Sequence, residues 1–270
     1  MTTKELIGVI GATGMTGSRI ADRLERDGHT VRRLARSTAI TFDWTIPETW
    51  AQALAGVRRL YVAYVPDLAA PGADAVIARL VDAARASGVT RIVLLSGRGE
   101  EGARVAEDIV LGSGIDATIV RSSWFSQNFT EGMLAPGVQA GVIPLAAGQA
   151  REPFIDVDDL ADVAVAALTG TGHAGEVYEV TGPELLTFDE AARILSDARG
   201  HAVVYVPLSL EDFRAAMTEA LDADAADLLT DLCREVFDGR NESVTDGVQR
   251  ALGREPRSLR GVVSAAVRTP

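Results

Sequence analysis

Short apolar runs alternate with amphipathic segments through the first half of the chain. The apolar runs are rich in Val, Ile and Leu, which predicts β-strands, whereas the longer segments repeat apolar residues every three or four positions, which predicts α-helices. Strands are expected at residues 7–10, 30–34, 40–42, 60–65, 91–95 and 117–121, and helices at residues 15–27, 48–54, 73–87 and 102–112. This alternation predicts an α/β fold in which helices cover both faces of a doubly wound parallel sheet.

Beyond Arg121 the pattern becomes less regular, and prolines and glycines interrupt residues 136–148. Thr187 and Glu190 have the spacing of a capping box, which marks the start of a helix. The later elements are expected to be a helix at residues 156–168, a strand at 177–180, a helix at 187–199 and a short strand at 203–206. From Leu208 onward the pattern predicts helices.

A glycine-rich turn, Gly11-Ala12-Thr13-Gly14-Met15-Thr16-Gly17, joins the first predicted strand to the first predicted helix. Gly11 permits a tight turn, Gly14 lets the backbone approach a diphosphate, and Gly17 lets helix and strand pack closely. The free N–H groups and the positive dipole end of the helix favour phosphate there. Since a strand precedes the turn and a helix follows it, the sequence predicts a dinucleotide site and a Rossmann-type fold.

The residues after the second strand select the dinucleotide. An acidic residue there would bind the 2′-hydroxyl of NAD, but this chain has Arg36-Ser37. Arginine binds a 2′-phosphate through paired hydrogen bonds, so we expect NADP(H), with a plain surface charge as the alternative for Arg36. Arg32 or Arg33 could assist, and Asp43 is either an adenine contact or a turn residue. The expected cofactor contacts are Gly11, Thr13, Gly14, Met15, Thr16, Gly17, Arg36, Ser37, Ala63 and Ser122.

These elements suggest two parts of the chain. Residues 1–122 are expected to form the dinucleotide-binding core, and residues 123–270 mainly a smaller C-terminal lobe that binds substrate. Segments near residues 150–180 are expected to return to the core.

Composition limits the partners of the protein. The chain has 26 Lys and Arg against 38 Asp and Glu, a formal net charge of −12. That charge argues against nucleic acid or an anionic membrane as a direct partner. No apolar run approaches the roughly 20 residues of a membrane span, and the charged Lys4-Glu5 before the first strand is unlike a secretory signal. Cys233, the only cysteine, is interpreted as a packed thiol and forms no spaced set with the three histidines. We therefore expect no metal and a reducing, cytoplasmic location.

Lys4 is the only lysine in the chain. Many short-chain dehydrogenases use a Tyr-x-x-x-Lys pair, in which the lysine lowers the pKa of the tyrosine and holds the ribose. None of the 4 tyrosines here has a lysine four residues later, so hydride chemistry would need another proton donor or none.

Polar side chains at the ends of the later strands are the candidates for catalysis. Ligands of open parallel sheets bind beyond such carboxyl ends, where Tyr64, Ser96 and Arg98 are expected. Any of these could polarise an acceptor oxygen, and a core aromatic, a turn cap and a surface ion pair are the respective structural alternatives. After the sixth strand, an apolar wall with two amides is expected to contact substrate through Trp124, Phe125, Gln127 and Asn128.

The order of these landmarks resembles that of the NmrA-like family of atypical short-chain dehydrogenases, which are NAD(P)-binding proteins with a Rossmann fold. The glycine turn has the family's GATGxTG form, residues 28–36 resemble its second strand, and residues 124–129 resemble the segment over the nicotinamide. The resemblance implies either an NAD(P)-dependent reductase or an NADP(H)-binding redox sensor. Glu107 resembles a glutamate of the family. Reductase members often carry His or Lys four residues before that glutamate, but this chain has Ala103 at that position.

The sequence therefore predicts an NADPH-dependent oxidoreductase that acts on a small, largely apolar carbonyl, enone or quinone without a Tyr-Lys pair. The alternative is a non-catalytic NADP(H)-binding redox sensor or regulatory protein with a protein partner. A cofactor-independent isomerisation or cyclisation is a third interpretation. The aromatic and amide residues at 124–128 favour the enzyme, whereas the missing Tyr-Lys pair and Ala103 favour the sensor. The substrate and the oligomeric state stay open.

Overall fold

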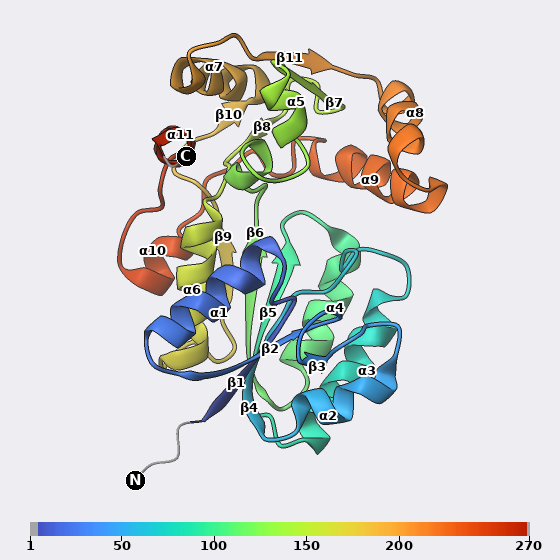
Figure 1. Cartoon of the computed structure of the whole chain (residues 1–270), viewed down its shortest axis with the longest axis vertical. Coiled ribbons are helices and arrows are strands. Elements are labelled where there is room, and N and C mark those ends of the chain that lie inside the picture. The colour runs from blue at the N-terminus through green and yellow to red at the C-terminus, as the bar shows by residue number, and fades with distance from the viewer. Residues whose placement is uncertain (1–4, 269–270) are drawn as a thin grey trace.

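The computed structural model describes residues 5–268 and has a seven-stranded parallel sheet at its centre (Figure 1). The strand order is β3-β2-β1-β4-β5-β6-β9, with the crossover after β3 that separates the two halves of a Rossmann sheet. The strands are β1 (Leu6–Ile10), β2 (Thr30–Ala35), β3 (Ile40–Thr41), β4 (Val57–Val62), β5 (Arg91–Gly97), β6 (Asp116–Ser122) and β9 (Val177–Val180). The predicted Rossmann-type α/β fold is confirmed.

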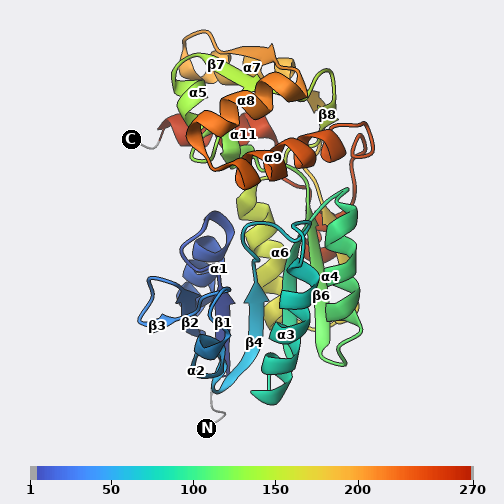
Figure 2. The same ribbon diagram turned by 90° about the vertical axis from the view of Figure 1, so that its right-hand side faces the viewer.

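Helices cover both faces of this sheet (Figure 2). One face packs against α1 (Met15–Arg26), α6 (Val157–Thr169) and α10 (Gly247–Leu252), and the other against α2 (Trp50–Leu54), α3 (Ala73–Ala86) and α4 (Glu101–Leu111). Successive residues of a strand point to opposite faces. In β1, Ile7 and Val9 therefore join one buried cluster while Ile10 joins the other. Burial on both faces explains why these strands are almost wholly apolar.

Most of the chain after β6 forms a smaller lobe above the sheet (Figure 1). Its elements are η2 (Ser126–Phe129), α5 (Ala135–Gln139), β7 (Val142–Leu145), β8 (Arg151–Glu152), β10 (Leu186–Thr187), α7 (Phe188–Arg199), β11 (Val204–Pro207), α8 (Leu210–Ala220), α9 (Ala223–Val236) and α11 (Leu259–Arg268). β11 pairs with β7 and β10 with β8, in two small sheets. A third buried cluster, which includes Phe129, Phe154, Phe188 and Phe213, holds the lobe together. The capping box predicted at Thr187 and Glu190 is present.

The structure differs from the predicted elements in two places. The fourth strand is Val57–Val62 and not residues 60–65, because Arg58 and Arg59 interrupt its apolar pattern although both lie within the strand. Arg59 is accommodated by donating to the Leu168 carbonyl at 2.9 Å. The region after Leu208 is not helical throughout, since residues 237–246 and 253–258 are turns and loops that pass between the lobe and the core.

Candidate active site

The glycine turn lies between β1 and α1 and has the geometry of a phosphate cradle. Gly11 has a φ of +80°, and a Cβ on Gly17 would stand 2.2 Å from the Gly11 carbonyl oxygen, so neither position accepts a side chain without movement. Gly14 is the N-cap of α1, and no side chain among the described residues caps that helix. The first N–H groups of α1 are therefore free to bind an anion, and Thr13 and Gly14 beside them are exposed. Thr16 is instead buried and accepts a hydrogen bond from Tyr61 at 3.0 Å.

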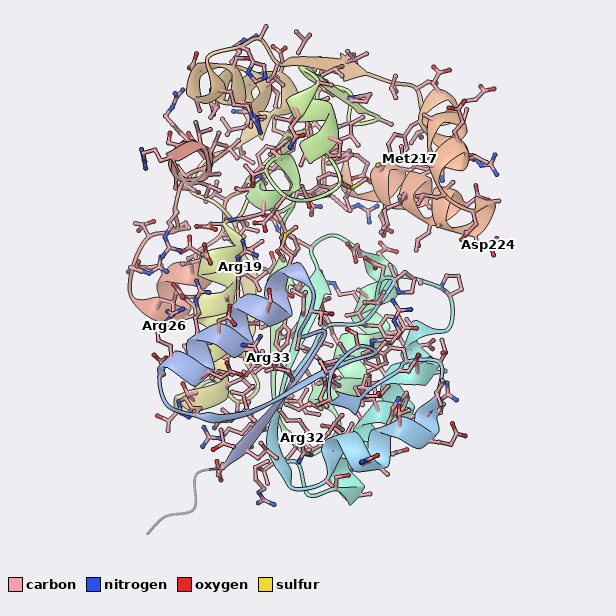
Figure 3. All side chains as sticks on the ribbon, viewed as in Figure 1. Arg19, Arg26, Arg32, Arg33, Met217 and Asp224 are labelled. Atoms are coloured by element: carbon pink, nitrogen blue, oxygen red, sulfur yellow. The ribbon has the colours of Figure 1, made fainter. Side chains whose placement is uncertain are left out.

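The three arginines near the end of β2 have different partners. Arg33 binds Glu25 and Asp22 on α1, and Arg32 donates to the carbonyl oxygens of Ala53 and Ala55 near the end of α2 (Figure 3). Arg36 is exposed and makes no hydrogen bond or ion pair with any described residue. It is therefore the arginine that is free to bind a 2′-phosphate.

Asp43, the possible adenine contact, holds a local turn. Its carboxylate accepts hydrogen bonds from the backbone and the side chain of Thr45, both at 2.8 Å. These bonds, and more weakly the charge of Arg36, lower the pKa of Asp43. The Asp43 carboxylate therefore stays ionised at neutral pH.

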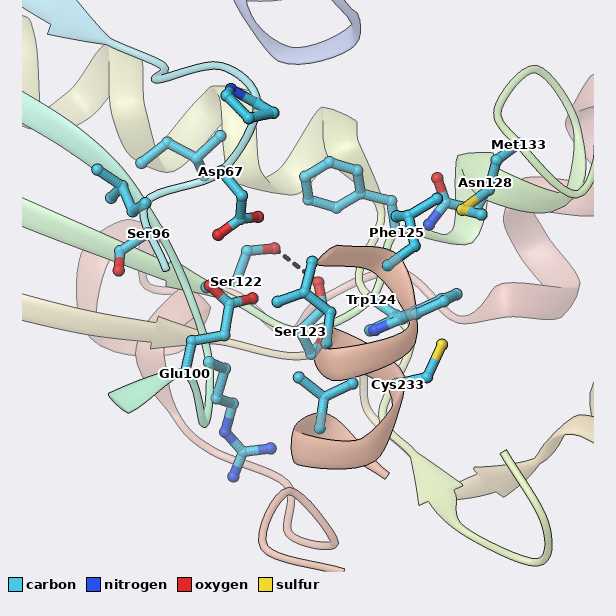
Figure 4. Close-up of a pocket in the computed structure, with 18 of the residues that line it drawn as sticks. Asp67, Ser96, Glu100, Ser122, Ser123, Trp124, Phe125, Asn128, Met133 and Cys233 are labelled. Carbon is cyan, nitrogen blue, oxygen red and sulfur yellow. Dashed lines mark hydrogen bonds between the residues drawn. The ribbon is translucent and has the colours of Figure 1, made fainter. Parts of the chain in front are cut away.

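A cavity of about 320 Å³ opens at the carboxyl ends of β4, β5 and β6, between the sheet and the C-terminal lobe (Figure 4). Helix α9 covers it with Leu229, Leu232, Cys233 and Val236. From the sheet side and the segment after β6, its lining includes Tyr64, Ser96, Arg98, Ser122, Trp124, Phe125 and Asn128, all of which the sequence placed near substrate or cofactor. These residues therefore line one cavity, at the sheet edge that binds ligands in open α/β folds.

Residues next to the cavity lining lie close to the glycine turn. Ala63, the residue before Tyr64, has its Cβ 3.2 Å from the Cβ position of Gly11. Met15 Cε similarly lies 3.2 Å from the Cβ position of Gly132, and Asn128 is in contact with the same glycine. A dinucleotide whose diphosphate lies on the turn can thus extend toward the cavity along the ends of β1 and β4.

The cavity wall is aromatic on two sides. Trp124 packs against Phe237, with ring centroids 4.8 Å apart, and its backbone N–H donates to Glu152 at 3.0 Å. Tyr64 packs edge-to-face on Trp44, also at 4.8 Å, and burial raises the pKa of its hydroxyl. Since Tyr64 remains protonated over the physiological range, it can donate a hydrogen bond but cannot serve as a base.

Gln127 differs from the other residues expected to contact substrate. Its side chain is buried outside the cavity, where Nε2 donates to Asp156 at 2.6 Å and Oε1 accepts from the Val157 N–H at 2.9 Å. Asp156 itself caps α6 by accepting from the Asp158 N–H. Gln127 therefore joins η2 to the start of α6, and of the two amides only Asn128 lines the cavity.

Ser96 and Arg98 line the cavity, but internal hydrogen bonds occupy both. Ser96 Oγ donates to Glu107 Oε1 at 2.6 Å, and Glu107, which is 1% exposed, is also bound by the Arg121 guanidinium. Arg98 binds Glu179 at 3.3 Å and donates to the Asn241 carbonyl at 2.8 Å. Ser96 therefore has no proton free for a substrate, and the bonds of Arg98 to Glu179, Asn241 and Ser243 hold its guanidinium in place.

Three carboxyl groups of the cavity were missed from the sequence, namely Asp67, Glu100 and Glu152. Burial raises the pKa of Glu152 to about 7 and is the main cause of the raised pKa values of Asp67 and Glu100. Asp67 and Glu100 lie in loops, where charged residues are normally solvated, so no sequence pattern distinguished them. Cys233 also lines the cavity, and burial raises its pKa to about 12, which keeps the thiol protonated and unreactive.

Metal-ligand clusters and membrane-spanning helices are both absent from residues 5–268. Within that range, no group of three His, Cys, Asp or Glu side chains is arranged to hold a metal ion. None of the helices described there is long and apolar enough to cross a membrane. Lys4, the only lysine, lies outside the described residues.

Comparison with known proteins identifies the cofactor. A family model for NAD(P)H-binding proteins matches residues 11–171, which include the glycine turn and Arg36. The uncharacterised oxidoreductase YesF of Bacillus subtilis (strain 168) is 34% identical over 93% of this chain and 91% of its own length.

Two solved structures with bound cofactor have the same fold. The triphenylmethane reductase of Citrobacter sp., complexed with NADP(H), has a TM-score of 0.81 and 25% identity, over 96% of this chain and 99% of that one. The NADPH-dependent quinone oxidoreductase QOR2 of Escherichia coli, complexed with NADPH, also has a TM-score of 0.81 and 25% identity, over 96% of this chain and 99% of its own. With the family match, these structures show that the chain binds NADP(H), and they support NAD(P)H-dependent oxidoreductase activity.

Proposed function

This chain belongs to the NAD(P)H-binding family, as an NmrA-like atypical short-chain dehydrogenase, and we propose that it is an NADPH-dependent reductase of a small, largely apolar carbonyl, enone or quinone. The observation that carries the proposal is the cavity of about 320 Å³ at the carboxyl ends of β4 to β6, whose lining residue Tyr64 follows Ala63 beside the dinucleotide turn. Its walls suit a flat, apolar acceptor, because Tyr64, Trp124 and Phe125 present aromatic surface to it.

The residues divide the work between cofactor and acceptor. The free N–H groups at the start of α1 would hold the diphosphate, and Arg36 the 2′-phosphate. When bound, NADPH supplies the hydride. Trp124 and Phe125 would exclude water and orient the acceptor, and Asn128 would donate to a polar group on it.

We assign substrate binding mainly to the lobe formed by residues 123–270 and cofactor binding to residues 1–122. Segments near residues 150–180 return to the core, since α6 packs against α1 and β9 extends the sheet beside β6. Helix α9 closes the cavity from the lobe side, which supports a role for the lobe in choosing the acceptor.

Turnover with NADPH tests the proposal. Purified protein should consume NADPH, in preference to NADH, with at least one member of a panel of quinones, enones and aromatic aldehydes. Trp124→Ala should lower kcat/KM by roughly tenfold or more, since a large buried aromatic side chain contributes about 1.5–3 kcal/mol. NADPH affinity should not change in this variant, because Trp124 contacts Phe188 and Phe237 and not the glycine turn.

The redox-sensor alternative makes the opposite prediction. Ser96 and Arg98 are held by hydrogen bonds within the protein, and the same arrangement would be expected in a non-catalytic protein. Tight NADPH binding without consumption of NADPH by any acceptor would contradict the reductase proposal and favour the sensor.

A further inference from the structure

Two carboxyl groups from different loops meet inside the cavity. Asp67 lies in the loop after β4, and Glu100 in the loop after β5, immediately before α4. Figure 4 shows both carboxyl groups pointing into the cavity, near Ser122. Asp67 and Glu100 are close enough for each to affect the ionisation of the other, and Asp67 Oδ1 accepts from the Ala69 N–H at 2.8 Å.

The inward orientation of Glu100 depends on a glycine. A Cβ on Gly97 would stand 2.0 Å from the Glu100 carboxyl carbon, so only glycine at that position leaves room for the carboxyl group. As the N-cap residue of α4, Glu100 would normally cap the helix with its side chain, but it makes no such bond. The side chain is therefore folded against the end of β5, toward the cavity.

The surroundings of the pair favour one shared proton. Two carboxylates in contact do not both ionise readily, and Glu100 Oε2 is buried without a hydrogen-bond donor among the described residues. The neighbouring charges on the elements packed around it, Glu107 of α4 and Glu235 of α9, are also acidic. Burial, followed by the charge of Asp67, raises the pKa of Glu100 to about 9. Burial also raises the pKa of Asp67, and the Ala69 N–H and Glu100 offset only part of that rise.

The cations near this pair are bound elsewhere. Arg98 pairs with Glu179, and Arg240 binds Glu235 at 3.0 Å. No arginine among the described residues forms an ion pair with Glu100 or Asp67. Glu100 therefore holds an acidic proton in the cavity at neutral pH, whereas the Ser96 proton is already donated to Glu107 and the Glu152 carboxyl accepts from the Trp124 N–H.

We propose that Glu100 is the catalytic acid of the reductase and that Asp67 is the positioning residue that keeps it protonated. This inference rests on the proposed function. As hydride adds to the acceptor carbon, the π pair of the C=O bond moves to oxygen, and the Glu100 O–H bond breaks to give that oxygen its proton. The pair is left doubly ionised, and Glu100 is reprotonated by water.

Two kinds of acceptor separate this role from a structural one. A carbonyl or quinone needs a proton as well as a hydride, whereas a triarylmethyl cation dye needs only the hydride. Glu100→Gln should lower kcat at saturating quinone by about 10²–10⁴-fold, the usual contribution of general acid catalysis, and leave kcat for the dye within about twofold. Glu101→Gln, the same change one residue later on a side chain that is 87% exposed, is the matched control and should leave both rates unchanged.

Asp67→Asn tests the positioning role through pH. Removing the charge of Asp67 lowers the pKa of Glu100, so the pH above which quinone reduction declines should move to a lower value, with activity restored in acid. A merely structural role would lower the rate without moving the profile. Infrared spectra of the cofactor-free protein give a readout without turnover, since a protonated carboxyl band should persist at pH 8, where Glu152 is mostly ionised, and be lost in Glu100→Gln.

The outcomes are distinguishable. Equal quinone rates in wild type and Glu100→Gln, or equal losses with quinone and dye, would overturn the assignment while leaving the reductase proposal intact. Absence of the infrared band would also overturn it. No NADPH consumption by the wild-type protein with either acceptor would overturn the proposed function itself, and the assignment with it.

Discussion

The glycine turn and the cavity lie at the same edge of the sheet but are built in opposite ways. The turn consists of the consecutive residues 11–17 and presents backbone N–H groups. It requires glycines, because a side chain at these positions would collide with the backbone or fill the space of the diphosphate. The cavity draws its lining from segments as distant as Tyr64 and Val236 and depends on which side chains meet there. Changes in the turn should therefore affect the cofactor whatever the acceptor, and changes in the cavity should affect the acceptor whatever the cofactor.

The largest expected effect is in the turn. Gly14→Val should abolish NADPH binding, because its side chain would occupy the diphosphate position. The protein should still fold, since Gly14 has an extended backbone with φ −88° and ψ 175° that any residue can adopt. The one close neighbour of its Cβ position is the Gly11 carbonyl oxygen at 3.3 Å, a tight contact that a small shift of the turn would relieve. Saturating NADPH at about 100 times Kd stabilises a protein by about 2.7 kcal/mol, and this thermal shift should vanish.

Gly261→Val is the matched control for this change. Gly261 lies on exposed α11, and its Cβ position has a nearest neighbour at 3.5 Å. Its NADPH-dependent shift should equal that of the wild type. If folded Gly14→Val keeps the full thermal shift with NADPH, the diphosphate does not bind at the glycine turn.

A smaller effect is expected at the 2′-phosphate. Arg36→Ala should weaken NADPH binding by about 10- to 150-fold and leave NADH binding unchanged, because a hydrogen bond between charged groups contributes about 1.5–3 kcal/mol. Calorimetric titration with both cofactors measures this. Arg33→Ala provides the control, since that guanidinium already binds Glu25 and Asp22. A similar loss in both variants would mean that net charge, and not a specific contact, attracts the cofactor.

The smallest expected effect is a pH-dependent change in stability at Glu152, a carboxyl group of the cavity. Glu152 has a folded-state pKa of about 7 against a usual value of 4.5, so the folded form prefers the protonated acid. Its contribution to stability is therefore greatest below pH 4.5 and is lost as the pH rises toward 7 and beyond. Glu152→Gln should raise Tm relative to wild type at pH 8 and by less at pH 5, without changing NADPH affinity. A Tm difference independent of pH would contradict the assigned titration.

The same contrast explains how much could be predicted from the sequence. The turn was predictable because the strand, the glycines and the helix lie within one continuous stretch of chain. The carboxyl groups of Asp67 and Glu100 were not, because they are buried only where two loops meet under α9. Gln127 was predicted to contact substrate, and the sequence did not reveal its actual partners. Asp156 and the Val157 N–H lie about thirty residues later in the chain.

In the fold, too, features set by one stretch of chain were predictable and those that depend on distant partners were not. Strands buried on both faces gave clear apolar runs, and six of the seven sheet strands began within one residue of their predicted positions. The fourth began three residues early because Arg59 lies inside it, supported by the distant carbonyl of Leu168. The short strands of the C-terminal lobe, such as β8 and β10, carry too few residues to show a period.

The central claim is that the cavity brings an acceptor against the nicotinamide of NADPH bound at the glycine turn. Its most direct test is the fate of hydrogen from NADPH deuterated at nicotinamide C4, followed by mass spectrometry of the reduced enone. The account predicts that deuterium from one face of the ring appears on the acceptor carbon, with Trp124→Ala slowing its transfer. Deuterium that is lost to water, or that stays on the cofactor despite tight binding, would contradict the account.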